Sequence, residues 1–166
     1  MDNKTILIVA SILVGAFALM YLGRANVGTP SQGGAQGGPP SELLAQETFY
    51  NFGVISMANG NVEKTFSFRN QTDKDIKLES IVTSCMCTSA YLITPSGKQG
   101  PFKMPGMGYV PPAEDTLKPG EAREVQVVYN PNAHGPAGVG PIDRFVYVVD
   151  ASGGTLVFEI KAVVTP

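Results

Sequence analysis

Residues 145–162 have the sequence FVYVVDASGGTLVFEIKA, and this segment decides the fold class of the chain. Its first five residues are apolar on both faces, which is typical of a central β-strand. In its second half, Leu156, Phe158 and Ile160 alternate with the residues between them, as in a strand with one buried face. Residues 150–154, DASGG, have the composition of a tight turn. The segment therefore predicts a hairpin of two strands.

The same period of two recurs in the preceding residues. Apolar alternation is present in five further segments, which are 49–55, 62–68, 76–78, 81–92 and 125–129. Turn-forming residues lie between them, as in NQTDK at 70–74, and no amphipathic helix interrupts them. About seven short strands with this spacing predict an all-β fold, an Ig-like antiparallel β-sandwich over residues 47–166.

Two longer segments rich in proline and glycine interrupt the regular strand spacing. They are residues 94–117 and residues 131–141. Long loops in compact domains are usually either functional or disordered. The repeated proline and glycine of the second segment favour defined turns.

The first 24 residues predict a membrane segment. Residues 5–22 are uncharged and mainly Ile, Leu, Val, Ala and Phe, and their length approaches the ~20 residues of a transmembrane helix. Two interpretations stay open, namely a single transmembrane helix that anchors the chain and a signal peptide cleaved near Gly23-Arg24-Ala25. Residues 25–46 would form a flexible Gly/Pro-rich linker. Both interpretations place the C-terminal domain outside the cytoplasm.

Composition and motif content argue against several classes of function. The net charge is −2 and the 12 basic residues are scattered, so no nucleic-acid-binding face is expected. The chain has no paired acid and base, no Gly-x-Ser-x-Gly elbow, no phosphate-binding loop and no zinc-protease motif. We therefore expect no enzymatic activity, no catalytic residue and no small-molecule substrate.

The only two cysteines of the chain stand in the segment Thr83-Ser84-Cys85-Met86-Cys87-Thr88. In an extended strand, residues two apart share a face, so both thiols would lie together and Met86 would point into the core. A disulfide would be awkward there, because the Cα atoms would be near or beyond the usual upper limit for a bridge. Apolar packing, a disulfide, soft-metal binding and thiol–disulfide exchange all remain open.

The metal interpretation gains from residues in the two long loops. Thiolate and thioether ligands select Cu(I), and Met104 and Met107 in the first loop offer two more sulfurs. His134, the only histidine, is in the second loop. Loops at one end of a sandwich cluster in space, so the predicted site comprises Cys85, Cys87, Met104, Met107 and His134, with Cu(I) as the ion. The simpler alternative is that the methionines cover an edge of the core and that His134 is a surface residue.

Four motifs in order resemble a widespread bacterial family of unknown function, DUF1573. They are NFGVI at 51–55, FSFRN at 66–70, IVTSCMCT at 81–88 and LKPGE at 117–121. The resemblance covers roughly residues 47–166 and implies an Ig-like sandwich akin to the ASPM/SPD-2/Hydin and major-sperm-protein modules, often exported or anchored. It implies no established activity. Met86 replaces the glycine that the family has between the cysteines, and the segment 94–117 is longer than a compact member needs.

Three functional hypotheses follow. The leading one is a protein of the bacterial cell membrane with one span, whose extracytoplasmic domain holds or delivers a soft metal in the periplasm or at the cell surface. The first alternative is an interaction module that binds another envelope protein and has structural cysteines. The second is a thiol–disulfide role, which is disfavoured because reactive pairs are usually Cys-x-x-Cys at a helix N-terminus.

Overall fold

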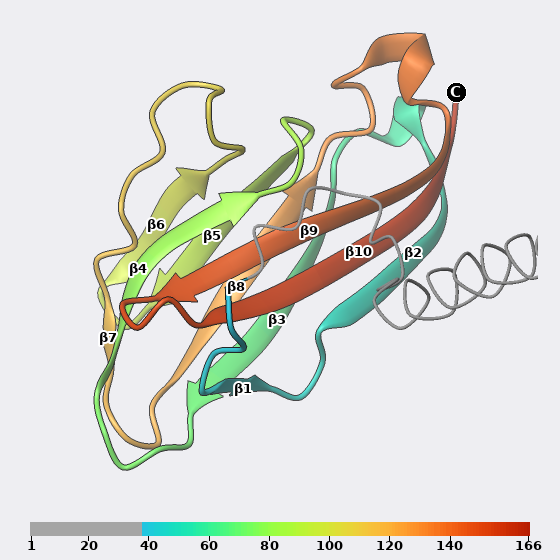
Figure 1. Ribbon diagram of the computed structural model, residues 1–166. Helices are drawn as coiled ribbons and strands as arrows, with labels where there is room; N and C mark the ends of the chain where they lie inside the picture. Colours follow the sequence, from blue (N-terminus) through green and yellow to red (C-terminus); the bar gives the residue numbers. More distant parts are fainter. Residues whose placement is uncertain (1–37) are drawn as a thin grey trace, which may run out of the picture. The chain divides into compact units, whose positions relative to one another are not determined.

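Two five-stranded β-sheets pack face to face around one apolar core (Figure 1). The computed structural model describes residues 38–166. One sheet contains, in spatial order, β1 (Leu43–Ala45), β3 (Val62–Asn70), β8 (Ala122–Tyr129), β5 (Thr88–Thr94) and β6 (Gly97–Phe102). The other contains β2 (Phe49–Ser56), β10 (Thr155–Thr165), β9 (Gly140–Asp150), β4 (Ile76–Thr83) and β7 (Thr116–Leu117). Two short 3-10 helices, η1 (Met57–Asn59) and η2 (Gly135–Gly138), lie in connections between strands.

The predicted all-β sandwich and its C-terminal hairpin are confirmed. β9 and β10 pair antiparallel with Val149 opposite Thr155 and Val148 opposite Leu156. β9 lies between β10 and β4, the central position that its apolar sequence predicted. Among the described sheet strands the pairing is antiparallel except between β2 and β10, which run parallel.

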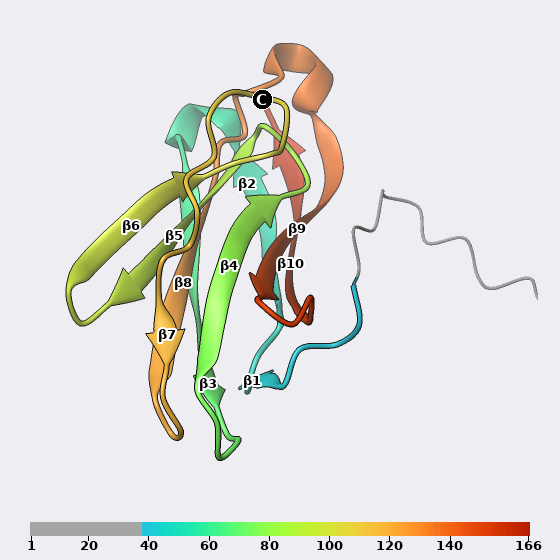
Figure 2. The ribbon, with the colours of Figure 1, turned by 60° about the vertical axis from the view of Figure 1, so that its left-hand side comes forward.

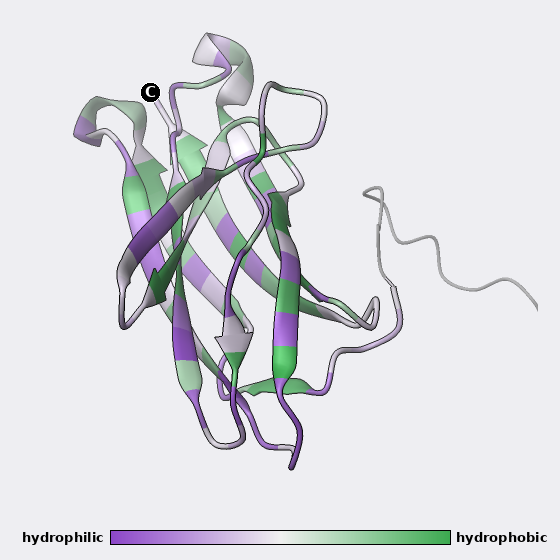
Figure 3. Cartoon of the chain, turned by 90° about the vertical axis from the view of Figure 1, so that its left-hand side faces the viewer, coloured by the Kyte–Doolittle hydropathy of each residue, from purple (hydrophilic) through white to green (hydrophobic). Residues whose placement is uncertain are grey.

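The core consists of the inward-facing residues of the alternating segments, and Figure 3 shows this alternation along the strands. The rings of Phe66 and Phe158 stack across the two sheets with centroids 4.8 Å apart, and Phe68 lies 6.2 Å from the same Phe158 ring. Each of the three side chains is 1% exposed. Burying a phenylalanine stabilises the fold by about 1.5–3 kcal/mol, so this cluster is a main tie between the sheets.

The number of strands differs from the prediction. The structure has ten strands instead of about seven, because β1, β6 and β7 add to those that the alternation indicated. β1 has three residues and β7 has two, too few to show a period. β6 lies inside the predicted loop 94–117, and its Gly97, Gly100 and Pro101 are residues that rarely occur in strands, so the sequence did not indicate it. β1 and a bridge from Pro40 to Thr155 lie ahead of residue 47, where the domain was expected to begin.

The prediction that the cysteines lie within one continuous strand is wrong. β4 ends at Thr83, β5 begins at Thr88, and residues 84–87 form a turn. β4 and β5 belong to different sheets, so the chain crosses from one sheet to the other at the cysteines. Figures 1 and 2 show this turn at the same end of the sandwich as η2 and the loop 103–115.

The predicted membrane segment, residues 1–24, lies outside the described residues, as does most of the predicted linker. Within residues 38–166, no helix has the length and apolar character needed to span a bilayer.

Candidate metal centre

The turn at residues 84–87 is held by hydrogen bonds to both sheets. Ser84 N donates to Phe145 O at 2.9 Å, and Phe145 N donates to Ser84 Oγ at 2.9 Å, which joins the turn to β9. Asn130 N donates to Cys87 O at 2.9 Å, which joins it to the end of β8. The backbone that carries the two cysteines is therefore fixed on each side.

Hydroxyl side chains at the strand ends explain why the chain turns here. Thr83 is 1% exposed, and its Oγ1 lies 3.0 Å from Cys85 O and 3.1 Å from Thr88 O, within donating distance of either. Thr88 N closes the turn by donating to Cys85 O at 3.1 Å. Ser and Thr side chains compete with ladder hydrogen bonds in this way and favour turns. The Thr-Ser-Cys-Met-Cys-Thr composition was the sequence signal for the turn.

Cys85 and Cys87 form a disulfide, with their Cα atoms 5.2 Å apart. The expected Cα separation, near or beyond the upper limit for a bridge, is wrong, because it assumed an extended backbone. The turn brings the Cα atoms within the usual range of about 4.4–6.8 Å. Met86 is 48% exposed, so the prediction that it belongs to the core is also wrong. In the turn it projects away from the sandwich interior instead of alternating into it.

The two sulfurs have different surroundings. Cys87 is 2% exposed and belongs to the core, whereas Cys85 is half-buried. Cys85 Sγ accepts a hydrogen bond from Cys87 N at 3.2 Å and lies 3.3 Å from His134 Nε2. Cys87 Sγ lies 3.8 Å from Thr88 Oγ1. Cys85 is thus the sulfur nearer to solvent.

His134 lies beside the cysteines, although 49 residues separate it from Cys85. It immediately precedes η2, in the connection between β8 and β9, and it is exposed. The ligand atoms of Cys85, Cys87 and His134 all lie within 4.8 Å of one another. Once the disulfide is reduced, two thiolates and one imidazole nitrogen at this spacing would form a donor set suited to a soft metal ion.

Met104 and Met107 lie in the loop 103–115 at the same end of the sandwich. Thr83 N donates to Lys103 O at 3.3 Å, so the residue before Met104 contacts the strand that leads into the cysteine turn. Met107 N donates to Met104 O at 3.3 Å. Met107 is 47% exposed and lines a shallow surface hollow with Pro101 and Tyr109. Ligation by these two sulfurs stays a prediction.

Arg144 is a residue of this site that sequence reasoning missed. Its Nε donates to Cys87 Sγ at 3.1 Å, and its Nη1 donates to Asp143 O at 2.8 Å. Along β9 it lies between Ile142 and Val146, on the face that points into the sandwich. An arginine at a position where the alternation predicts an apolar residue was the sequence signal that could have identified it. Burial raises the pKa of Tyr129, and the positive charge of Arg144 opposes this shift. Because Arg144 Nε donates to Cys87 Sγ, the guanidinium places a positive charge against the buried sulfur.

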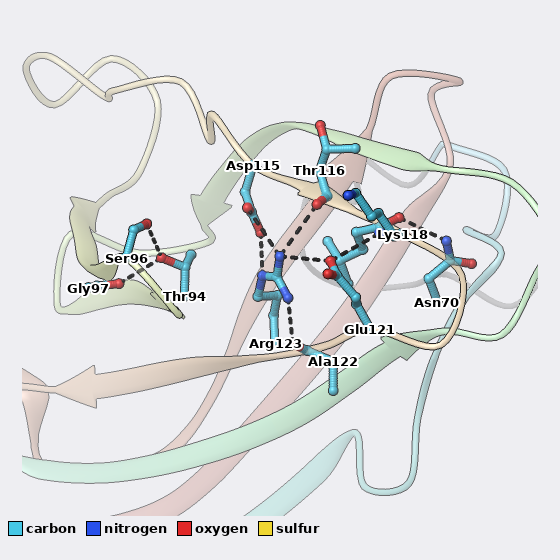
Figure 4. Close-up of polar contacts among 11 residues, drawn as sticks. Asn70, Thr94, Ser96, Gly97, Asp115, Thr116, Lys118, Glu121, Ala122 and Arg123 are labelled. Carbon is cyan, nitrogen blue, oxygen red and sulfur yellow. Dashed lines mark hydrogen bonds and ion pairs between the residues drawn. The ribbon is translucent and has the colours of Figure 1, made fainter.

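A second polar cluster fixes the far end of the loop that carries the methionines (Figure 4). Arg123 on β8 is 7% exposed, and it donates from Nε to Asp115 Oδ2 at 2.6 Å and from Nη2 to Glu121 Oε2 at 3.1 Å. Arg123 Nη2 also donates to Thr116 O at 3.4 Å. The cluster ties the start of β7 to β8 and has a structural role.

Comparisons with known proteins agree with the fold and leave the activity open. No curated protein matches the chain. A protein of unknown function from Porphyromonas gingivalis W83 aligns with a TM-score of 0.52 and 15% identity, over 81% of this chain and 50% of that one. A family 123 glycoside hydrolase from Clostridium perfringens aligns with a TM-score of 0.50 and 6% identity, over 70% of this chain and 22% of that one. This chain thus spans half or less of these proteins, and at such identities the likeness shows the fold alone.

The family comparison concerns the segment that contains both cysteines. The model of the family described as "Protein of unknown function (DUF1573)" matches residues 43–104, which run from β1 through β6. His134 and Arg144 lie outside the matched residues. Over residues 43–104, the resemblance to the DUF1573 family that the sequence motifs indicated is confirmed.

Proposed function

We propose that the chain holds a soft monovalent metal ion, with Cu(I) as the expected ion, when the Cys85–Cys87 disulfide is reduced. The ligands are the two thiolates and the imidazole of His134. The observation that carries this proposal is the convergence of their three ligand atoms within 4.8 Å in residues 38–166. Soft thiolate ligands select Cu(I), whereas structural zinc sites use four protein ligands.

The charge of the surroundings also favours a monovalent ion. Two thiolates and one Cu(I) ion leave one negative charge in excess, and the guanidinium of Arg144 at 3.1 Å from Cys87 Sγ offsets it. A divalent ion with the same ligands would leave the positive charge of Arg144 uncompensated. The site is therefore suited to the softer and less charged ion.

The proposed role is metal holding or delivery at the bacterial cell envelope. It draws on the apolar run at residues 5–22, which predicts a membrane segment ahead of a domain outside the cytoplasm. Met104 and Met107 would add thioether ligands if their loop closes over the cysteine turn.

Cu(I) titration of the full-length chain tests the proposal. The reduced protein, kept anaerobic, competes with a Cu(I) chelator, and we expect one equivalent to bind. The same protein with its disulfide intact is the matched control and should bind none. Substituting His134→Ala removes one of the three ligands and should weaken binding by at least the ~10–100-fold that loss of an outer-shell partner costs, and Cys85→Ser combined with Cys87→Ser should abolish it. Binding that is unchanged in the double serine variant contradicts the proposal.

The methionines are tested separately in the same titration. Met104→Leu and Met107→Leu retain the apolar volume and remove the sulfur. A weaker Cu(I) affinity in either variant would show that its thioether is a ligand. An unchanged affinity would limit the site to Cys85, Cys87 and His134.

A further inference from the structure

We infer that the Cys85–Cys87 disulfide exchanges with a partner dithiol, whose thiolate attacks Cys85 and displaces Cys87 as a thiolate stabilised by Arg144. This goes beyond metal binding, because no metal takes part in the step. Its product is the reduced pair that the proposed metal site needs. The Cys-x-Cys spacing argued against a thiol–disulfide role in the sequence, but the surroundings of the two sulfurs argue for it.

The first argument is the unequal exposure of the two sulfurs. The turn lies at an end of the sandwich, outside both sheets (Figure 2). Cys85 is half-buried there, while Cys87 is 2% exposed. A thiolate can attack only a sulfur that it can reach, and the other sulfur then leaves. Cys85 is therefore the attacked sulfur and Cys87 the leaving group.

The second argument is the charge beside the leaving group. When the bond breaks, Cys87 Sγ carries the electron pair and becomes anionic. Arg144 Nε donates to this sulfur at 3.1 Å, and its positive charge is permanent. A hydrogen bond to a charged group is stronger than one to a neutral group, so the bond from Arg144 strengthens as the negative charge develops.

The third argument concerns the second step of the exchange. The mixed disulfide joins Cys85 to one partner sulfur, and the second partner thiol attacks that partner sulfur and releases Cys85 as a thiolate. His134 Nε2 lies 3.3 Å from Cys85 Sγ and can give it a proton. In each step one S–S bond breaks and one forms. In total the partner dithiol loses two electrons and two protons and becomes a disulfide. One proton ends on Cys85, which becomes a thiol, and the other goes to solvent, because Cys87 stays a thiolate beside Arg144.

The fixed backbone keeps the two sulfurs together after reduction. Ser84 is hydrogen-bonded to Phe145 of β9, and Cys87 O accepts a hydrogen bond from Asn130 N at the end of β8, both at 2.9 Å. These bonds do not depend on the disulfide. Cys87 thus stays next to Cys85 and can attack any mixed disulfide formed there, so the exchange is reversible and leaves no trapped adduct in the unsubstituted chain.

The test uses the full-length chain with a metal chelator and dithiothreitol as the dithiol. The rate of disulfide reduction is followed by timed alkylation and mass spectrometry. Arg144→Gln should slow reduction by ~10–100-fold, the range expected for losing a hydrogen bond to a charged group, and Arg144→Lys should recover part of the rate. Arg69→Gln, an exposed arginine on β3, changes the net charge equally and should leave the rate unchanged. Equal rates in Arg144→Gln and Arg69→Gln overturn the inference.

A second measurement identifies the attacked sulfur without relying on Arg144. Glutathione disulfide is added to the reduced Cys87→Ser and Cys85→Ser variants. Cys87→Ser should gain one glutathionyl group at least ~10-fold faster, because its remaining thiol is the accessible one. Equal trapping by the two variants overturns the assignment. Both measurements are made without metal, so their outcome does not depend on Cu(I) binding. A chain that exchanges its disulfide but does not bind Cu(I) would contradict the proposed function and leave this inference standing.

Discussion

Replacing Asp150 with asparagine should destabilise the domain much more than the same change elsewhere on its strand. Asp150 ends β9 and is 3% exposed. Its carboxylate accepts hydrogen bonds from Ser41 Oγ at 2.5 Å, from Ser152 N and Oγ at 2.9 and 2.5 Å, and from Gly154 N at 3.0 Å. It therefore joins the turn between β9 and β10 to the first described residues of the chain.

The magnitude follows from the four bonds. Three of the four donors reach Oδ1, and only Ser41 Oγ reaches Oδ2. Asparagine keeps an acceptor oxygen for the three donors, but these bonds lose their charge, and its NH₂ group replaces the oxygen that faces Ser41. A hydrogen bond between neutral groups contributes about 0.5–1.5 kcal/mol. A hydrogen bond to a charged group contributes about 1.5–3 kcal/mol, and we expect Asp150→Asn to lower the free energy of unfolding by ~3 kcal/mol. At about 4 °C per kcal/mol for a domain of this size, Tm should fall by ~12 °C.

The effect should depend on pH with a defined sign. Burial alone would raise the pKa of Asp150, but hydrogen bonds from Ser152, Ser41 and Gly154 outweigh it and lower this pKa. A carboxyl group with a lowered folded-state pKa stabilises the fold above its unfolded pKa of ~3.9. That contribution is lost as the pH falls through the folded pKa. The difference between Asp150→Asn and the unsubstituted chain should be full at pH 7 and shrink below ~pH 4.

Thermal unfolding of the full-length chain, followed by circular dichroism from pH 7 to pH 3, measures both effects. Asp143→Asn is the matched control, because Asp143 lies on the same strand, is 46% exposed and pairs with Lys161 at 3.5 Å. An exposed pair contributes little, so the control should stay within ~0.5 kcal/mol of the unsubstituted chain. Equal stabilities of the two variants at pH 7 would refute the reasoning.

Three further substitutions test the fold and the cysteine turn by thermal or urea unfolding. Phe158→Ala should cost ~3–5 kcal/mol, because it removes the ring that packs on Phe66 at 4.8 Å; a loss below ~1 kcal/mol would contradict its place in the core. Met86→Lys should change stability by less than ~0.5 kcal/mol, since the side chain is 48% exposed; a loss above ~2 kcal/mol would restore the core position that the alternation indicated. Arg123→Met should lower the free energy of unfolding by ~3–5 kcal/mol, because it leaves Asp115 without its partner at 2.6 Å. An unchanged stability would show that the cluster does not stabilise the end of the loop.

The fold was largely predictable because its evidence is local. Most of the long strands alternate apolar and polar residues, β9 has the continuous apolar run of a central strand, and residues 150–154 have a composition typical of tight turns. The strands that the sequence did not indicate are those where local evidence fails. β7 has two residues, and β6 begins with glycine and contains Pro101. β7 pairs with β4, which is distant in the sequence, so a tertiary contact defines it. β6 pairs with the strand just before it, β5, and its glycine and proline content removes the local signal.

The candidate site was predictable only in part, and the reason lies at residues 84–87. Apolar residues continue on both sides of the turn, so the segment 81–92 resembles one strand. The buried positions are Ile81 and Thr83 before the turn and Ala90 and Leu92 after it, so they change from odd to even numbers across a break that the backbone makes. The proximity of His134 followed from the clustering of loops, which is a property of the architecture. The contact of Arg144 with Cys87 depends on the register of β9 against the turn, which no local pattern encodes.

The position of the turn between the sheets explains how so few residues assemble this site. β4 and β5 lie in different sheets, and so do β8 and β9, so residues 84–87 and the connection that carries His134 are neighbouring sheet crossings at one end of the sandwich. Each crossing begins and ends on a strand that the core holds, which keeps the sulfurs and the imidazole in place without a dedicated scaffold. Arg144 enters from β9, the strand that follows the second crossing. The same geometry serves the disulfide and the reduced pair, because the backbone bonds of the turn to Phe145 and Asn130 involve neither sulfur.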